Sequence, residues 1–529
     1  MSARGKERRG LEQTGCPATT RLHWNLEAPQ LYEAAIARGE ATLAAGGLFV
    51  LRTGQRTDRG PQDTFIVHEP GLHPEVDWGA VNRPLDNTTF DVLHGDFMAY
   101  LADRTLFALD AVAGADPEYR MPIRLVTELA WHNLFASTTF ITETSPEPRR
   151  QHRPPWTVID APSFKADPRR HGTGSDVFVV IHVSQRLVLI GGTSDAGEIR
   201  KAIVTVLNYT LPSQGVLSMH CSATIGATGD VALFLGLSGT GKATLSNDPA
   251  RRRIGDDEHG WSHRGVFSLE GGCYAKAVNA STDEPLLSAS TRRVGTVLEN
   301  VITLADTREW TDLSASPPPS CIEHAELLGL AGHPTNFVML TADAAGVLPP
   351  IARLTPEGAM YHFLSGYSAK IAGTANGVGE PRATFSACFG VRFLPLKPIA
   401  YARLLGEQIA RHQVHVWLVN TGWTGGPYGV GSRIRPAHAR ALIAAALGGQ
   451  LDAVTYRRDA IFNLDVPTVC PGVPERVLDP RSLWTDSTAY DDQATRLARM
   501  FILNFTTFER DVTKAVTAAG PTTRGGTTV

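Results

Sequence analysis

The segment DVALFLGLSGTGKATLS, residues 230–246, constrains the fold of this chain more than any other feature. Its apolar first half predicts a buried β-strand that runs directly into a glycine-rich loop, and a lysine follows the last glycine. The backbone N–H groups of such a loop turn inward on phosphate oxygens, and the lysine adds a positive charge. We therefore predict a phosphate-binding loop between a strand and a helix. Its residues are Gly236, Leu237, Ser238, Gly239, Thr240, Gly241, Lys242, Ala243 and Thr244.

The loop departs from the pattern G-x-x-x-x-G-K-[ST] at its eighth position, where Ala243 replaces a hydroxyl residue. In that pattern the hydroxyl binds the metal ion that accompanies the nucleotide. Thr244 is the next residue, but it lies about 100° further around the following helix and should not reach the same point. The motif alone leaves open whether the protein still transfers a phosphoryl group.

A second motif, IGDDEHGW, spans residues 254–261 and contains the adjacent acids Asp256 and Asp257. Paired carboxylates near a triphosphate usually hold the metal ion, directly or through water. A solvated acidic turn is the alternative interpretation. Two upstream residues are further candidates: His220 ends an apolar run, and Lys201 lies in GEIRKAIV. Taken alone, they resemble a packed core histidine and an ordinary lysine on a helix surface.

Charge and composition argue against several classes of protein. The formal net charge is −3 and 43% of the residues are hydrophobic, which fits a globular enzyme better than a general nucleic-acid binder. No apolar run approaches the length of a transmembrane helix, and the basic N-terminus lacks the apolar core of a secretory signal. The six cysteines are far apart, without a C-x-x-C pair, so we expect reduced thiols in a cytoplasmic protein. Small molecules are the expected partners, with neither nucleic acid nor membrane.

The 529 residues are enough for two or more domains. Strands are predicted over residues 177–183 and 186–192, and helical periodicity over residues 28–47 ends on glycines that can cap a helix. We predict a mixed α/β (α+β) fold with a substrate-side N-terminal domain and a C-terminal mononucleotide-binding domain that contains the phosphate loop. The expected divisions are a disordered tail over 1–20, the two domains over 21–215 and 216–515, and a second tail over 516–529.

A series of motifs occurs in order between Trp24 and Arg510, including APSFKADP, LVLIGGT, LSMHCSA, GDVALFLGLSGTGK, IGDDEHGW, YHFLSGYSAKIAGT and WLVNTGWTGGPYGVG. Together they resemble the ATP-dependent phosphoenolpyruvate carboxykinases. The resemblance implies decarboxylation of oxaloacetate and phosphorylation of the resulting enolate by ATP, which gives phosphoenolpyruvate, CO₂ and ADP. It also implies an active site in the cleft between two domains, in a monomer or small homo-oligomer.

The same resemblance implies two divalent ions, Mn²⁺ and Mg²⁺. Mn²⁺ would be bound by Lys201, His220 and Asp257, and a neutral lysine ligand requires a strongly lowered pKa. Asp256 would assist catalysis, and Lys242 would contact the β- and γ-phosphates of ATP. The residues implied for the nucleotide and the substrate are Glu284, Arg433 and Ile434 for ATP, and Arg59 for the substrate carboxylate.

The chain departs from this family at positions expected to face the substrate. Asp195 stands where the family usually has a tyrosine, and a carboxylate there would repel an anionic substrate unless the metal or Arg59 compensates. Ala439 replaces an adenine-side threonine. The family's arginine that contacts the transferred phosphate is either retained as Arg308 or replaced near Pro317, and the sequence does not decide between them.

Three interpretations follow from these departures. The first is a working carboxykinase in which the motif residues Lys201, His220, Asp256, Asp257 and Lys242 carry the chemistry. The second is a metal-dependent kinase on the same scaffold whose acceptor is another small molecule. The third is a catalytically impaired homologue that binds nucleotide.

Overall fold

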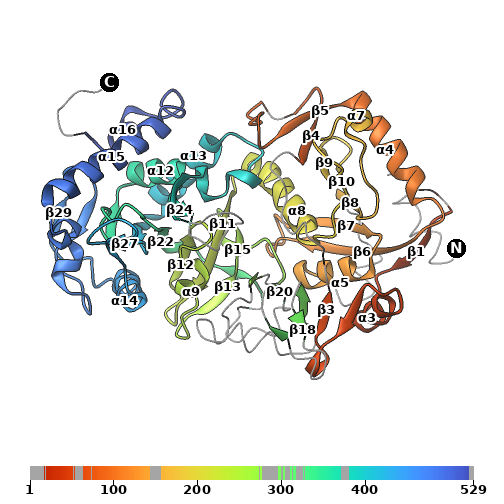
Figure 1. Ribbon diagram of the computed structural model, residues 1–529, viewed down its shortest axis with the longest axis horizontal. Coiled ribbons are helices and arrows are strands. Elements are labelled where there is room, and N and C mark those ends of the chain that lie inside the picture. The colour runs from red at the N-terminus through yellow and green to blue at the C-terminus, as the bar shows by residue number, and fades with distance from the viewer. Residues whose placement is uncertain are drawn as a thin grey trace. The chain divides into compact units, whose positions relative to one another are not determined.

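The computed structural model describes most of the chain as two compact units (Figure 1). The described residues are 17, 19–51, 53, 63–72, 74–142, 156–272, 275–276, 296–299, 302–303, 310–311, 314–316, 326, 328–370 and 380–523. The first unit contains residues 1–211, 267–330 and 392–396, and the second contains residues 212–266, 331–391 and 397–529. Helices and strands alternate in both units, which confirms the predicted α/β class.

The first unit is organised around a mixed β-sheet. In sheet order its strands are β1 (Arg21–Trp24), β6 (Thr105–Ala113), β7 (Met121–Thr127), β8 (Trp156–Ala161), β10 (Leu187–Gly191), β9 (Phe178–His182), β4 (Thr64–His68) and β5 (Arg83–Asp86). β9 and β10 confirm the strands predicted over 177–183 and 186–192. Because side chains alternate along a strand, Phe107 and Ala108 of β6 belong to two separate apolar cores.

Helices pack against both cores of this sheet. The helices of the first unit are α3 (Ala28–Ala37), α4 (Asn87–Leu101), α5 (Ala130–Thr139), α7 (Pro168–His171) and α8 (Gly197–Thr210). Phe90, Leu93 and Phe97 of α4 fill one core, and Leu31 of α3 meets Trp131 of α5 in the other. The second core also receives Ala196, the residue before α8, so it fixes the start of that helix.

The helix predicted over residues 28–47 is shorter than its periodicity suggested. α3 ends at Ala37, Gly39 takes a left-handed φ of 71°, and residues 41–43 form a strand instead. This strand, β2 (Ala41–Leu43), pairs with β3 (Phe49–Leu51), which also pairs in parallel with β17 (Val297–Glu299). The small sheet continues through β20 (Ser314–Ser316) to β16 (Ala275–Lys276). Pairing of β2 with the nearby β3 therefore overrides the local helical pattern, and pairing of β3 with β17 brings residues late in the sequence into the first unit.

The second unit contains the phosphate loop and most of a larger mixed sheet, in which only residues 267–268 of β15 and 330 of β21 are counted with the first unit. In sheet order its strands are β21 (Leu330–Ala331), β15 (Gly265–Ser268), β14 (Glu258–Ser262), β11 (Leu217–Ile225), β12 (Val231–Leu235), β22 (Pro334–Thr341), β26 (His415–Asn420), β23 (Ile351–Leu354), β30 (Asp465–Pro467) and β29 (Tyr456–Arg458), and β13 (Arg252–Gly255) pairs with β11. β12, β22 and β26 are parallel neighbours, so their carboxyl ends meet at one edge, where open α/β sheets bind ligands.

The remaining elements of the chain are helices and short strand pairs. The helices are α9 (Lys242–Ser246), α12 (Pro356–Ser365), α13 (Pro398–His412), α14 (Pro436–Leu447), α15 (Ser487–Phe505) and α16 (Lys514–Ala518). The short pairs are β18 (Ile302–Thr303) with β19 (Trp310–Thr311), β24 (Tyr367–Lys370) with β25 (Arg382–Phe385), and β27 (Trp423–Thr424) with β28 (Ser432–Arg433). No helix in the described part of the chain is long and apolar enough to cross a membrane.

The C-terminal tail predicted over 516–529 begins too early. α16 extends to Ala518 because the Thr513 side chain caps its first turn by accepting a hydrogen bond from the Val516 N–H. The Val516 side chain is buried. Ordered backbone therefore continues into the predicted tail, and residues 524–529 lie outside the described part.

Candidate active site

The phosphate loop follows β12 and leads into α9, as the sequence predicted. Gly239 and Gly241 both have a φ of 87°, a left-handed conformation that favours glycine. Gly236 is needed for a different reason, because a Cβ on it would lie 2.5 Å from the Thr240 hydroxyl oxygen. These backbone requirements explain the glycine spacing of the motif.

Buried contacts hold the loop in this shape. The hydroxyl of Thr240, which is fully buried, donates to the carbonyl of Leu237 over 2.8 Å. Thr421 follows β26 and donates from its hydroxyl to the Thr240 carbonyl, also over 2.8 Å. The guanidinium of Arg433 donates to the Gly239 carbonyl over 3.0 Å. Arg433 thus lies at the loop, as a nucleotide-contacting residue should.

The neighbouring candidate Ile434 lies in the same region. Its backbone N–H donates to the Gly422 carbonyl over 2.7 Å, and its side chain is buried. Arg433 also donates from Nε to the Thr421 carbonyl over 3.0 Å. The segment 421–434 and the phosphate loop are therefore one hydrogen-bonded assembly.

Ala243 and Thr244 lie in the first turn of α9, directly after Lys242. The Ala243 carbonyl accepts from the Asn247 N–H over 3.0 Å, so its backbone is helical. The methyl group of Ala243 offers no oxygen to a metal ion. Successive helical residues point about 100° apart, so Thr244 does not replace the missing hydroxyl in direction.

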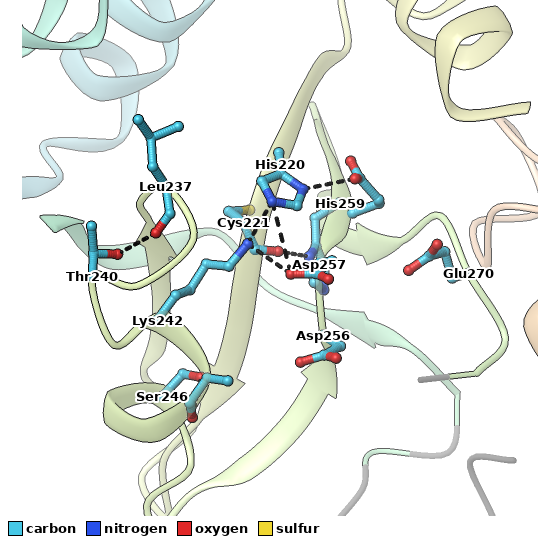
Figure 2. Close-up of polar contacts among 12 residues, drawn as sticks. His220, Cys221, Leu237, Thr240, Lys242, Ser246, Asp256, Asp257, His259 and Glu270 are labelled. Atoms are coloured by element: carbon cyan, nitrogen blue, oxygen red, sulfur yellow. Dashed lines mark hydrogen bonds and ion pairs between the residues drawn. The ribbon is translucent and has the colours of Figure 1, made fainter. Parts of the chain in front are cut away.

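A charged cluster lies beside the loop (Figure 2). The Lys242 ammonium nitrogen is 2.7 Å from Asp257 Oδ1 and 2.9 Å from His220 Nε2. His220 Nδ1 is 2.8 Å from Glu258 Oε1. An ammonium can only donate, so His220 Nε2 accepts from Lys242. The ring proton therefore resides on Nδ1, which donates it to the Glu258 carboxylate. This carboxylate–histidine arrangement leaves the Nε2 lone pair directed at a cation.

Strand register explains how these residues meet. β11 and β14 are antiparallel, and His220 and Glu258 are directly opposite each other. Residues in such a pair project from the same face of the sheet. Asp256 and Asp257 form the bend between β13 and β14.

The two acids of the predicted pair have different partners. Asp257 faces Lys242, whereas Asp256 is buried and accepts from Arg253 over 3.1 Å. The resemblance assigned Asp257 to the metal ion and Asp256 to catalysis, without giving the partner of either carboxylate. Only the fold distinguishes the carboxylate beside the lysine from the one that is paired with an arginine.

The first unit carries a second cluster at the start of α8. The Lys201 ammonium nitrogen is 3.1 Å from Asp195 Oδ2 and 2.9 Å from Glu198 Oε1. Asp195 is 5% and Glu198 2% exposed. Burial raises the pKa of Asp195, and the charge of Lys201 opposes that rise. Asp195 is thus paired with Lys201, so the repulsion of an anionic substrate expected from its sequence position is reduced.

Asp195 also organises the backbone before α8. Its Oδ1 accepts from the Gly197 N–H over 2.9 Å, and its own N–H donates to the Thr193 hydroxyl over 3.1 Å. A tyrosine at this position would keep the backbone donor but could not accept from the Gly197 N–H, since the only polar atom of its side chain is at the far end of the ring. The substitution therefore changes both the local charge and the turn that leads to Lys201.

The sequence-predicted site residues fall into three groups. Lys201 and Asp195 belong to the first unit, whereas His220, Lys242, Asp256, Asp257, Arg433 and Ile434 belong to the second. The predicted Mn²⁺ ligands come from both units, and this three-ligand set stays a prediction. Arg59, Glu284, Arg308 and Pro317 lie outside the described residues. Sequence reasoning missed Glu198 and Glu258, although each is within three residues of a predicted ligand.

The donor set of the second unit fits a divalent cation. His220 Nε2 and Asp257 Oδ1 converge on one positive group, the Lys242 ammonium. Imidazole nitrogen and carboxylate oxygen are both ordinary ligands of Mn²⁺. Among the described residues no group of three or more His, Cys, Asp or Glu side chains is arranged to hold a metal ion. The predicted set instead contains a lysine.

A buried strand, a glycine loop, a lysine and an acidic bend beside it define a phosphate-loop nucleotide-binding protein. The sequence model of the phosphoenolpyruvate carboxykinase family matches residues 20–476, and the chain belongs to that family. A phosphoenolpyruvate carboxykinase (ATP) of Geobacter metallireducens is 50% identical over 96% of this chain and 97% of its own length. The corresponding proteins of Geotalea uraniireducens and Thermus thermophilus are 51% and 50% identical, over 96% and 97% of this chain and 97% and 99% of their own lengths.

Proposed function

We propose that this protein is an ATP-dependent phosphoenolpyruvate carboxykinase. It converts oxaloacetate and ATP to phosphoenolpyruvate, CO₂ and ADP, as a gluconeogenic enzyme of the cytoplasm. Relatives that are half identical over nearly their whole length carry this name. The observation that carries the proposal is the Lys242 ammonium, held between His220 and Asp257 at the end of a phosphate loop.

The loop and its neighbours bind the nucleotide. Backbone N–H groups of residues 236–241 receive the phosphate oxygens, and Lys242 contacts the β- and γ-phosphates. Arg433 and Ile434 pack against the adenine, and Glu284 contacts the nucleotide. Lys242 is paired with Asp257, so a phosphate contact of Lys242 would compete with this ion pair.

Mn²⁺ would be held by Lys201, His220 and Asp257, and Mg²⁺ would accompany ATP. When bound, the ions supply electrostatic stabilisation of the negative charge that develops on the enolate and phosphoryl oxygens. Glu258 keeps the proton of His220 on Nδ1, so that Nε2 remains a ligand atom. A phosphate contact of Lys242 would leave the Asp257 carboxylate available to the cation.

The substrate end of the site depends on arginines. Arg59 holds the carboxylate of oxaloacetate, and Arg308 contacts the phosphoryl group in transfer. An arginine at that second position is worth on the order of 10³-fold or more in rate. The alternative of a kinase with another small-molecule acceptor loses support, because the carboxylate of Asp195, one of the departures behind it, is paired with Lys201.

The test is an assay of the purified protein with oxaloacetate, ATP, Mg²⁺ and Mn²⁺ that follows phosphoenolpyruvate and ADP separately. Equal amounts of both products support the proposal, and the Lys242→Met variant should form neither. ADP without phosphoenolpyruvate in the presence of oxaloacetate would indicate another acceptor. Bound ATP without either product would indicate a nucleotide-binding homologue.

A further inference from the structure

A buried histidine–aspartate pair in the first unit has no role in the chemistry described so far. His132 lies in α5 and Asp160 in β8, and they are 0% and 1% exposed. His132 Nδ1 is hydrogen-bonded to Asp160 Oδ2. The other ring nitrogen, Nε2, is 3.2 Å from the carbonyl oxygen of Ser194. One imidazole thus joins a sheet strand to the segment that precedes α8.

The hydrogen bonds define where the protons lie. A backbone carbonyl can only accept, so Nε2 of His132 carries a proton and donates it to Ser194. The Nδ1–Oδ2 contact needs one further proton, which makes the pair neutral overall whichever atom holds it. Burying two ionisable groups is costly unless they satisfy each other, as His132 and Asp160 do here.

The carbonyl that His132 holds belongs to the residue before Asp195. Asp195 accepts from the Gly197 N–H and pairs with the Lys201 ammonium at 3.1 Å. On the other side of the turn, Ala196 packs in the same apolar core as Trp131, the neighbour of His132. Rotation of the Ser194–Asp195 peptide would therefore move the carboxylate that orients Lys201. Helix α5 therefore holds this turn through the hydrogen bond from His132 to Ser194 and through the apolar core that its residues share with Ala196.

We propose that His132, oriented by Asp160, is a positioning residue that fixes the Ser194–Asp195 turn and thereby places the Lys201 amine for the divalent cation. This inference rests on the proposed function in one respect, the assignment of Lys201 as a metal ligand. His132 itself touches neither substrate nor metal.

The main test compares two substitutions in the full-length protein, of which Asp160→Asn is isosteric. His132→Asn keeps an amide near the Nδ1 position but removes the donor to Ser194. Asp160→Asn is the matched control, because its amide can donate to Nδ1 while Nε2 still donates to Ser194. Mn²⁺ affinity is measured by electron paramagnetic resonance titration without substrate. We expect His132→Asn to weaken it about tenfold, the lower end of the range for outer-shell partners, and Asp160→Asn to change it less than about threefold.

Two controls separate positioning from general damage. The affinity for ATP without divalent metal, which depends on the second unit, should be unchanged in both variants, and thermal melting reports their folding. If His132→Asn does not fold, His132→Gln replaces it, because its longer amide reaches Ser194 and should preserve Mn²⁺ affinity. Two results would overturn the proposal. One is a folded His132→Asn variant with normal Mn²⁺ affinity. The other is a tenfold loss of Mn²⁺ affinity in His132→Gln while Asp160→Asn keeps normal affinity.

A second readout is independent of the metal. The rate at which Lys201 is acetylated by acetic anhydride, mapped by mass spectrometry, should rise in His132→Asn and stay unchanged in Asp160→Asn. If the unmodified protein forms no phosphoenolpyruvate but the Lys201 labelling pattern holds, the proposed function fails and the positioning role stands. Equal labelling in all variants removes the positioning role, whatever the assay of the reaction gives.

Discussion

At the scale of single residues, Glu258 determines which nitrogen of His220 can bind a metal. Replacing Glu258 by leucine removes the acceptor 2.8 Å from Nδ1, so the ring can place its proton on Nε2 or rotate. We expect Mn²⁺ affinity to fall about 10- to 100-fold, the usual effect of losing such a partner. Glu258→Gln is the matched control and should lose less, because its amide oxygen still accepts from Nδ1. Equal affinity in the leucine variant and the unmodified protein would contradict this role.

Ala243 gives a second prediction at this scale. Ala243→Thr restores a hydroxyl in the first turn of α9, next to Lys242. If the nucleotide-bound Mg²⁺ lacks one ligand here, the added oxygen should raise kcat/KM for MgATP by about tenfold, since bonds to charged groups contribute roughly 1.5–3 kcal/mol. Steady-state kinetics at varied Mg²⁺ would measure it. Thr244→Ala, one position further round the helix, should change the Mg²⁺ dependence much less, and an unchanged Ala243→Thr would mean that the site no longer uses this ligand.

Much of the charged cluster was predictable from residue types, but the pairing between its residues was not. The motif residues Lys242, His220 and Asp257 were identified as candidates, and the structure brings these three together. Glu258 was not identified, because its role depends on lying opposite His220 in the β11–β14 register. The resemblance gave Asp256 and Asp257 different roles, but only the structure shows that Asp256 is paired with Arg253. A residue's chemical type is local, whereas its partner depends on a strand distant in sequence.

At the scale of elements, the packing of α12 against α15 buries a histidine. His362 of α12 contacts the ring of Phe501 of α15, and burial lowers the pKa of His362 from its ordinary 6.5 to about 4. Between these values the unfolded chain binds a proton that the folded protein does not. The stability that this residue contributes is therefore present above pH 6.5 and is lost as the pH falls towards 4.

The corresponding measurement is the free energy of unfolding as a function of pH. Because of His362, the free energy of unfolding should decrease by up to about 1.4 kcal/mol for each pH unit between 6.5 and about 4. His362→Phe retains an aromatic ring in the same cluster and should make the fall between pH 6.5 and 4 shallower. Denaturant unfolding at several pH values tests this, and identical slopes in the two proteins would refute it.

Elements with strong local signals were predicted correctly. The apolar strands β9, β10 and β12 lie where their sequences indicated. The helix predicted over 28–47 was wrong beyond Ala37, because β2 pairs with β3. Periodicity reports the preference of one segment, and a strand partner supplied from elsewhere can outweigh it.

At the scale of the whole molecule, the site residues divide between two units that the sequence does not separate cleanly. The phosphate loop and its acidic bend belong to the second unit, whereas Lys201 with its two carboxylates belongs to the first. Residues 267–330 join the first unit although they follow the loop in sequence. A division of the sequence into consecutive domains cannot describe these two units, because the pairing of β17 with β3 links segments far apart in the chain.

This division predicts that nucleotide binding and the complete reaction can be separated by mutation. Lys201→Met should leave the affinity for ATP without divalent metal unchanged, because the phosphate loop and Arg433 lie in the other unit. Lys242→Met removes a charge that contacts the phosphates and should weaken ATP binding by roughly tenfold or more, on the scale of one charged hydrogen bond. Both variants should lose phosphoenolpyruvate formation. Calorimetric titration with ATP, next to the product assay, distinguishes the two effects. If Lys201→Met weakened ATP binding as much as Lys242→Met, nucleotide binding would depend on both units, and the assignment of separate roles to the two lysines would be wrong.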